Sequence, residues 1–101
     1  MTLKAAFIFL APEVNSDKDR QTVMTPQVEL TAVAAGNYKE AQALAIQLVE
    51  QGTEAIELCG GFGNRGAALI AEAIAGKAAV GVVRFDGHPG LGGKSGDEMF
   101  K

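Results

Sequence analysis

The chain has 101 residues, of which 48% are hydrophobic and 21% are charged, and its formal net charge at pH 7 is -3. These values are typical of one compact domain and exclude a disordered tail or a fibre. Nine Lys and Arg against twelve Asp and Glu argue against nucleic-acid or anionic-membrane binding, because both need clustered positive charge. A single cysteine excludes an intrachain disulfide framework.

The chain carries no convincing targeting signal and no apolar run of the length that a membrane span needs. We therefore expect a cytoplasmic protein with a reduced thiol, without nucleic-acid or membrane partners.

Four apolar runs predict β-strands, because they are short, rich in β-branched or aromatic residues and bordered by Gly or Pro. They cover residues 4–11, 27–35, 53–59 and 79–85. The polar segment 12–26 has no such pattern, and we expect either a loop or a turn or two of helix there.

Two helices are predicted between these strands. The first starts at Asn37, which has Glu40 three residues on as in a capping box, and it ends at Gly52. The second covers about 64–75, with small and apolar residues along one stripe and Gly76 at its end.

This order of elements predicts an α/β fold in one domain, 1–101. We expect a small, mostly parallel, four-stranded sheet with two main helices on one face, like a half-barrel or a flavodoxin-like fragment. Alternation along the strands divides the side chains into an apolar face and a polar face. The apolar set is Val28, Leu30, Ala32, Ile56, Leu58, Val83 and Phe85; the polar set is Glu29, Thr31, Glu57, Cys59, Val82, Arg84 and Asp86.

The helices are expected to cover the apolar face and leave the polar face open. For such a small chain this predicts a homo-oligomer, a dimer or higher, that covers the polar face. The alternative is that this face is simply solvated.

The third and fourth predicted strands end alike, at Glu57-Leu58-Cys59-Gly60 and at Arg84-Phe85-Asp86-Gly87. If they are parallel neighbours in matching register, Glu57 lies beside Arg84 and Cys59 beside Asp86. Ligands of α/β proteins bind at this carboxyl edge. A purely structural salt bridge between Glu57 and Arg84 is the alternative.

A glycine-rich loop, CGGFGNRG, follows the third strand, and Gly61, Gly63 and Gly66 fit G-x-G-x-x-G. Dinucleotide binding is disfavoured, because that motif normally follows the first strand of a larger sheet. The broader expectation is an anion site for phosphate or carboxylate at the start of the second helix. It would be formed by Gly60, Gly61, Gly63 and Asn64. A glycine turn without a ligand is the alternative.

Cys59 is the best candidate nucleophile, with His88 as its base and Asp86 to orient His88. The alternative is an inert, buried cysteine. No paired Cys or His spacing supports a metal site, and no cofactor is indicated. Residues 87–101 form a glycine-rich arm that includes Lys94. We expect either a lid over the strand ends or a frayed terminus.

The motifs ELCGGFG and VRFDGHPGLGGKSGDE, with the opening KAAFIFLAP, resemble a family of uncharacterised bacterial proteins of about 100 residues. The resemblance covers nearly the whole chain. It implies a small α/β domain of unknown function and transfers no catalytic residue.

From the residues themselves we expect the protein to bind a small anionic metabolite at the carboxyl ends of strands 3 and 4, with Glu57, Arg84 and Lys94 among the ligand-binding residues. Turnover of that metabolite is left open. The alternative is a noncatalytic homo-oligomeric assembly or regulatory protein.

Overall fold

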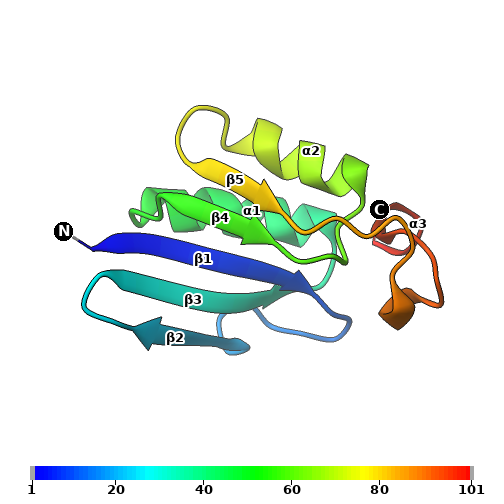
Figure 1. Cartoon of the computed structure of the whole chain (residues 1–101), viewed down its shortest axis with the longest axis horizontal. Helices are drawn as coiled ribbons and strands as arrows, with labels where there is room; N and C mark the ends of the chain where they lie inside the picture. The colour runs from blue at the N-terminus through cyan, green and yellow to red at the C-terminus, as the bar shows by residue number, and fades with distance from the viewer. Residues whose placement is uncertain (1, 101) are drawn as a thin grey trace.

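The computed structural model describes residues 2–100. It confirms the α/β class and the mostly parallel sheet, with two longer helices packed on it (Figure 1). In chain order the elements are β1 (Leu3–Leu10), β2 (Arg20–Met24), β3 (Val28–Ala35), α1 (Tyr38–Glu50), β4 (Ala55–Leu58), α2 (Asn64–Ala73), β5 (Ala79–Val82), the short 3-10 helix η1 (Pro89–Leu91) and α3 (Gly96–Met99).

The sheet has five strands in the order β2-β3-β1-β4-β5, one more than predicted. The additional strand, β2, lies in segment 12–26 and pairs antiparallel with β3 at the edge of the sheet. Its sequence, RQTVM, is short and mostly polar, so its own pattern does not predict a strand. Pairing with β3 stabilises it, including a 2.8 Å hydrogen bond between the hydroxyls of Thr22 and Thr31.

Both longer helices lie behind the sheet in Figure 1, as predicted, and leave the opposite face uncovered. The cap of α1 is confirmed: Oδ1 of Asn37 accepts a hydrogen bond from the amide of Glu40 at 2.9 Å. Between the helices and the sheet lies one apolar core. Its largest fully buried side chains are Ile8, Ile56, Leu58, Ile70, Ile74 and Val33.

The strand register corrects the predicted faces of β3. Ile8 lies between Val33 of β3 and Leu58 of β4, and all three side chains are buried under the helices. Phe7, one residue earlier, lies between Ala32 and Glu57. Aligned residues of neighbouring strands point to the same side.

The expectation that Leu30 and Ala32 share a face with Ile56 and Leu58 is therefore wrong. Alternation could not settle the face of β3, because the strand ends in the continuous apolar run Ala32–Ala35.

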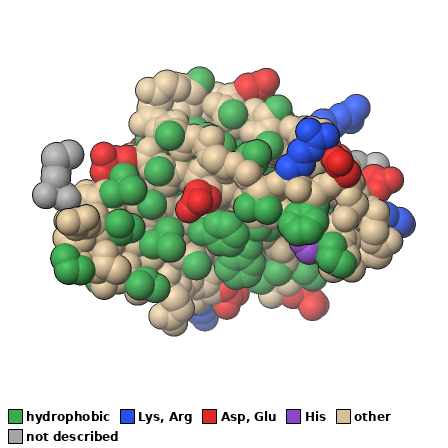
Figure 2. All heavy atoms as spheres, viewed as in Figure 1, with side chains coloured by type: hydrophobic (Ala, Val, Ile, Leu, Met, Phe, Trp, Pro, Cys, Tyr) green, Lys and Arg blue, Asp and Glu red, His purple; other side chains and the backbone are tan. Residues whose placement is uncertain are grey.

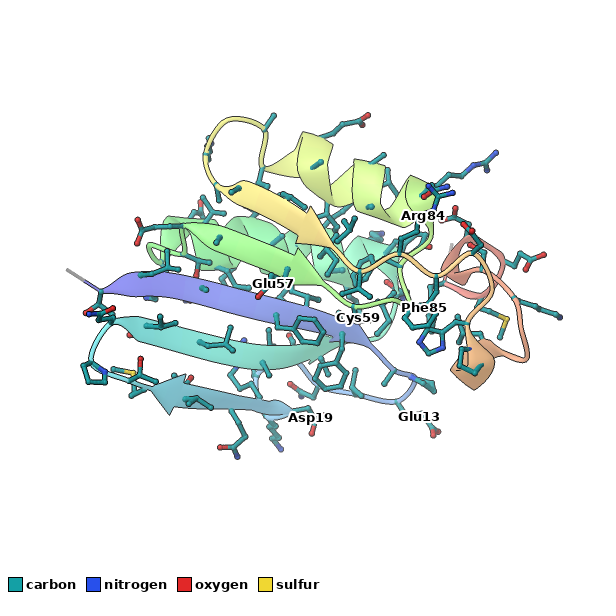
Figure 3. The ribbon with its side chains drawn as sticks, in the orientation of Figure 1. Glu13, Asp19, Glu57, Cys59, Arg84 and Phe85 are labelled. Atoms are coloured by element: carbon teal, nitrogen blue, oxygen red, sulfur yellow. The ribbon has the colours of Figure 1, made fainter. Side chains whose placement is uncertain are left out.

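The uncovered face of the sheet, which we call the open face, is consequently more apolar than predicted. Hydrophobic side chains cover much of this side of the molecule in Figure 2. The acidic Glu57 projects from the middle of the sheet, as Figure 3 shows in the same orientation. The registers assign to this face Ala5, Phe7, Gln21, Val23, Leu30, Ala32, Ala55, Glu57, Ala79 and Gly81.

Among residues 2–100, no helix is long and apolar enough to cross a membrane.

Candidate functional site

The two strand ends that the sequence singled out are parallel neighbours, β4 and β5, but their register differs from the expected one. Glu57 is aligned with Gly81, so Arg84 lies three residues further along, beyond the end of β5. The expected placement of Glu57 beside Arg84 and of Cys59 beside Asp86 is wrong. Motifs that look alike do not fix a register, because backbone pairing starts wherever the loops allow it.

Arg84 instead forms a salt bridge with its own near neighbour. Its Nε lies 2.9 Å from Oδ1 of Asp86, and the two side chains are 67% and 83% exposed. Figure 3 shows Arg84 near the start of α2, well away from Glu57, which lies in the middle of the sheet. Such an exposed pair contributes little to stability.

The glycine-rich loop before α2 is occupied by the C-terminal arm. The carboxylate of Asp97 accepts hydrogen bonds from the amides of Arg65 at 3.0 Å and Gly66 at 3.1 Å. These are orphan amides of the first turn of α2, whose own N-cap, Gly63, has no side chain to bind them. The anionic group at this helix start is therefore a side chain of the same protein.

Tyr38 connects α1 to the same carboxylate. Its hydroxyl donates to Oδ1 of Asp97 at 2.7 Å and accepts from the amide of Gly63 at 3.0 Å. Burial and the hydrogen bond to Asp97 raise the pKa of Tyr38 above its ordinary value. For Asp97, burial by itself raises the pKa of the carboxyl group. The hydrogen bonds from Arg65, Tyr38 and Gly66 outweigh it and lower the pKa of Asp97.

The described part of the arm is thus folded against the glycine-rich loop and the start of α2. The backbones of His88 and Lys94 pair with each other, and Ser95 and Glu98 form a capping box that starts α3. Gly96 packs so tightly on the carbonyl of Gly61 that a Cβ atom at this position would collide with it. The arm positions Asp97 in this way.

Cys59, the candidate nucleophile, and its candidate partners His88 and Asp86 each have a different hydrogen-bond partner. Sγ of Cys59, at the end of β4, is 3.3 Å from the amide of Gly61. Nδ1 of His88 accepts from the amide of Gly90 at 2.9 Å, and its ring stacks at a tilt on Phe85, 4.6 Å between centroids. Asp86 is held by Arg84. Within residues 2–100 no hydrogen bond links Cys59, Asp86 and His88 to one another.

A hollow of about 350 Å³ lies on the open face, toward the carboxyl ends of β1 and β3. Its floor is apolar and its rim is charged, and the rim comes from the segment that joins β1 to β2. Asp19 and Glu13, labelled in Figure 3, lie on that segment. The lining residues are Phe9, Lys18, Asp19, Arg20, Gln21 and Ala32.

Lys18, the cation of this rim, forms no salt bridge within residues 2–100. Arg20 is aligned with the buried Val33, so its side chain points to the helix-covered side of the sheet, and its Nε donates to the carbonyl of Ser16 at 2.7 Å. Asp19 accepts instead from the amide of Asn15 at 2.8 Å. Sequence reasoning missed this site, because its only signal was the run Lys18-Asp19-Arg20 in a segment without periodicity.

A second hollow, of about 320 Å³, lies between the first turns of α1 and α2. Lys39 and Arg65 line it, but so does Asp97. Its positive charge therefore already faces a carboxylate of the chain. Among the described residues, no group of three or more His, Cys, Asp or Glu side chains is placed to hold a metal ion.

Together, these features define the class: a small α/β domain with helices on one side of its sheet and a ligand-sized hollow on the open side. The chain belongs to the family described as "Family of unknown function (DUF6506)", whose model matches residues 3–98. This confirms the family resemblance seen in the sequence. No curated protein and no solved structure matches the chain.

Proposed function

We propose that the protein binds a small organic anion in the hollow on the open face. The observation that carries this proposal is a hollow of ligand size on the open face whose cation, Lys18, forms no salt bridge in residues 2–100. Its volume, about 350 Å³, lies in the range of about 300–1,000 Å³ typical of small-molecule sites.

The chemistry of the lining favours a carboxylate or phosphate group attached to an apolar body. The ammonium of Lys18 is a hydrogen-bond donor of positive charge, which suits either anion. The ring of Phe9 and the methyl group of Ala32 offer an apolar surface to the rest of the ligand.

This location differs from the one expected from the sequence, at the carboxyl ends of β4 and β5. The amides of the loop there already bind the carboxylate of Asp97. The hollow beside β1 and β3 also has a carboxylate in its lining, Asp19, but Asp19 accepts from the amide of Asn15 and forms no salt bridge with Lys18 in residues 2–100. Turnover remains a prediction. The amide of Cys59 donates to the carbonyl of Ile8 at 3.0 Å, which aligns Cys59 with Phe9 at the edge of the hollow.

The test is a thermal-shift screen of carboxylates and phosphate esters, followed by calorimetric titration of the compounds that stabilise the protein. At a ligand concentration 100 times Kd, binding stabilises a protein by about 2.7 kcal/mol. Lys18→Gln should weaken binding roughly tenfold, as expected for loss of one charge-assisted contact.

Lys77→Gln is the matched control, since it removes the same charge from an exposed lysine near the far end of the helices, beside Ile46 and Ile74. Equal affinity of the Lys18 and Lys77 variants, or no stabilisation by any of these anions, would contradict the proposal.

A further inference from the structure

The open face is unusually apolar for a surface in contact with water. Phe7, Phe9 and Leu30 are only partly buried there, and the edge residue Val23 is 59% exposed. The segment after β5 adds Phe85, which is 40% exposed. A contiguous apolar surface of this kind on a small domain indicates a contact with another molecule.

The total exposed area supports the same conclusion. The chain exposes 6040 Å², whereas a monomer of 10.4 kDa is expected to expose about 5,400 Å².

The strand order gives the open face an internal symmetry. β1 is the central strand, with β3 and β2 on one side and β4 and β5 on the other. A two-fold axis parallel to β1 and in front of the sheet would lay β3 on the partner's β4 and β2 on the partner's β5. Sheets that pack face to face with nearly aligned strands lie about 10 Å apart.

Two rows of side chains cross all five strands on the open face, one through Ala5 and one through Phe7, and the registers fix the residues of each row. In this arrangement every residue of these rows outside β1 faces a residue of the partner subunit, and each facing pair combines a longer side chain with a shorter one. The opposed pairs are Val23 with Ala79, Leu30 with Ala55, Gln21 with Gly81 and Ala32 with Glu57. Complementary size of this kind is what close packing requires.

The last of these pairs, Ala32 with Glu57, also brings the charge of Glu57 close to an opposite charge. Glu57 and Ala32 are both aligned with Phe7, one on each side of it. The axis therefore places Glu57 of one subunit over Ala32 of the other, and Ala32 lines the hollow that has Lys18 at its rim. The carboxylate in the middle of an apolar face thus comes close to Lys18, a cation that forms no salt bridge in residues 2–100.

We infer that the partner of the open face is a second copy of this chain, packed about that axis with Glu57 of each subunit at the hollow of the other. The dimer does not depend on the ligand proposed above. The two meet at Lys18, for which a bound anion and Glu57 of the partner subunit compete. Filling the hollow with an anion therefore weakens the dimer.

The first test is the oligomeric state of the wild-type chain by sedimentation velocity from 1 to 100 µM, without added organic anions. A dimer is expected, and a monomer throughout would overturn the inference. Gly81→Arg should shift the dimer to monomer. A Cβ atom added at Gly81 meets nothing within 4 Å in the monomer, whereas the proposed axis sets this position opposite Gln21 of the partner subunit. Ala71→Arg, on the exposed side of α2, is the matched control and should leave the dimer intact.

The second test is a charge exchange between Glu57 and Lys18. Glu57→Lys and Lys18→Glu should each weaken the dimer at least tenfold, as expected when one partner of a charge pair at an interface is lost. The double variant E57K/K18E should recover most of the affinity.

A dimer that Gly81→Arg disrupts but that the charge variants leave unchanged would refute the placement of Glu57. A dimer that tolerates Gly81→Arg would refute the use of the open face. Neither result bears on ligand binding, which the calorimetric titration measures separately.

Discussion

The carboxylate of Asp97 is expected to be the contact that holds the C-terminal arm to the body of the protein. Asp97→Ala removes the two hydrogen bonds to the first turn of α2 and the one from Tyr38. Loss of a helix cap costs about 0.5–2 kcal/mol, and loss of a negative charge near the helix start costs a further 0.3–1 kcal/mol or so. The Tyr38 hydroxyl also loses its acceptor, at about 1 kcal/mol.

Because the Asp97 side chain is only partly buried, the lower part of these ranges applies. We expect the free energy of unfolding to fall by about 2 kcal/mol, which for a chain of this size lowers Tm by roughly 10 °C. Urea unfolding followed by circular dichroism gives the first quantity, and calorimetry gives the second.

The matched control is Asp86→Ala, since Asp86 also carries one negative charge but bonds only the exposed Arg84. This change should cost less than about 0.5 kcal/mol. Hydrogen exchange locates the effect: amides of α3 and of the first turn of α2 should exchange faster in Asp97→Ala, while those of β1 and β3 stay protected. If Asp97→Ala and Asp86→Ala unfold at the same urea concentration, Asp97 does not anchor the arm.

Four further predictions concern the same loop and its surroundings. The lowered pKa of Asp97 contributes stability that is present above the ordinary value of 3.8 and is lost as the pH falls through the lower folded-state pKa. Acid titrations of Asp97→Asn and wild type should therefore converge once the pH is below the folded-state pKa of Asp97. The raised pKa of Tyr38 has the opposite effect. Its contribution to the stability of the folded protein is complete below the ordinary value of 10.0 and declines as the pH rises above that value. Tyr38→Phe should remove this alkaline decline, and an equal decline in both proteins would show that Tyr38 is not its cause. Gly96→Ala should destabilise by more than about 2 kcal/mol, because the added Cβ meets the backbone of Gly61; an unchanged urea midpoint would contradict this tight approach. If Cys59 is a nucleophile, iodoacetamide should label it at pH 7 faster than it labels free cysteine, and mass spectrometry of the time course would show the reverse if it is inert.

Local sequence was sufficient to predict the two longer helices, α1 and α2, and the class of fold. The α1 cap depends on Asn37 and Glu40, which are three residues apart, so the hydrogen bonds that start this helix form within one short segment. The one-sided helical layer followed from the order of elements and the handedness of crossovers between parallel strands, which the sheet confirms.

The tertiary structure alone decided the strand pairing and the site. β2 exists because β3 lies beside it, and the face of Leu30 became known only from its alignment with Ala5 of β1. The anion site that the glycine loop indicated is filled by Asp97, whose bond to Arg65 joins residues 32 positions apart. The hollow likewise combines Phe9 of one strand, Ala32 of another and Lys18 of a connecting segment. Short-range hydrogen bonds and periodicity determine helices, because their partners are a few residues away. Registers and pockets depend on long-range contacts. The residue pattern of one segment does not specify which distant segment it will contact.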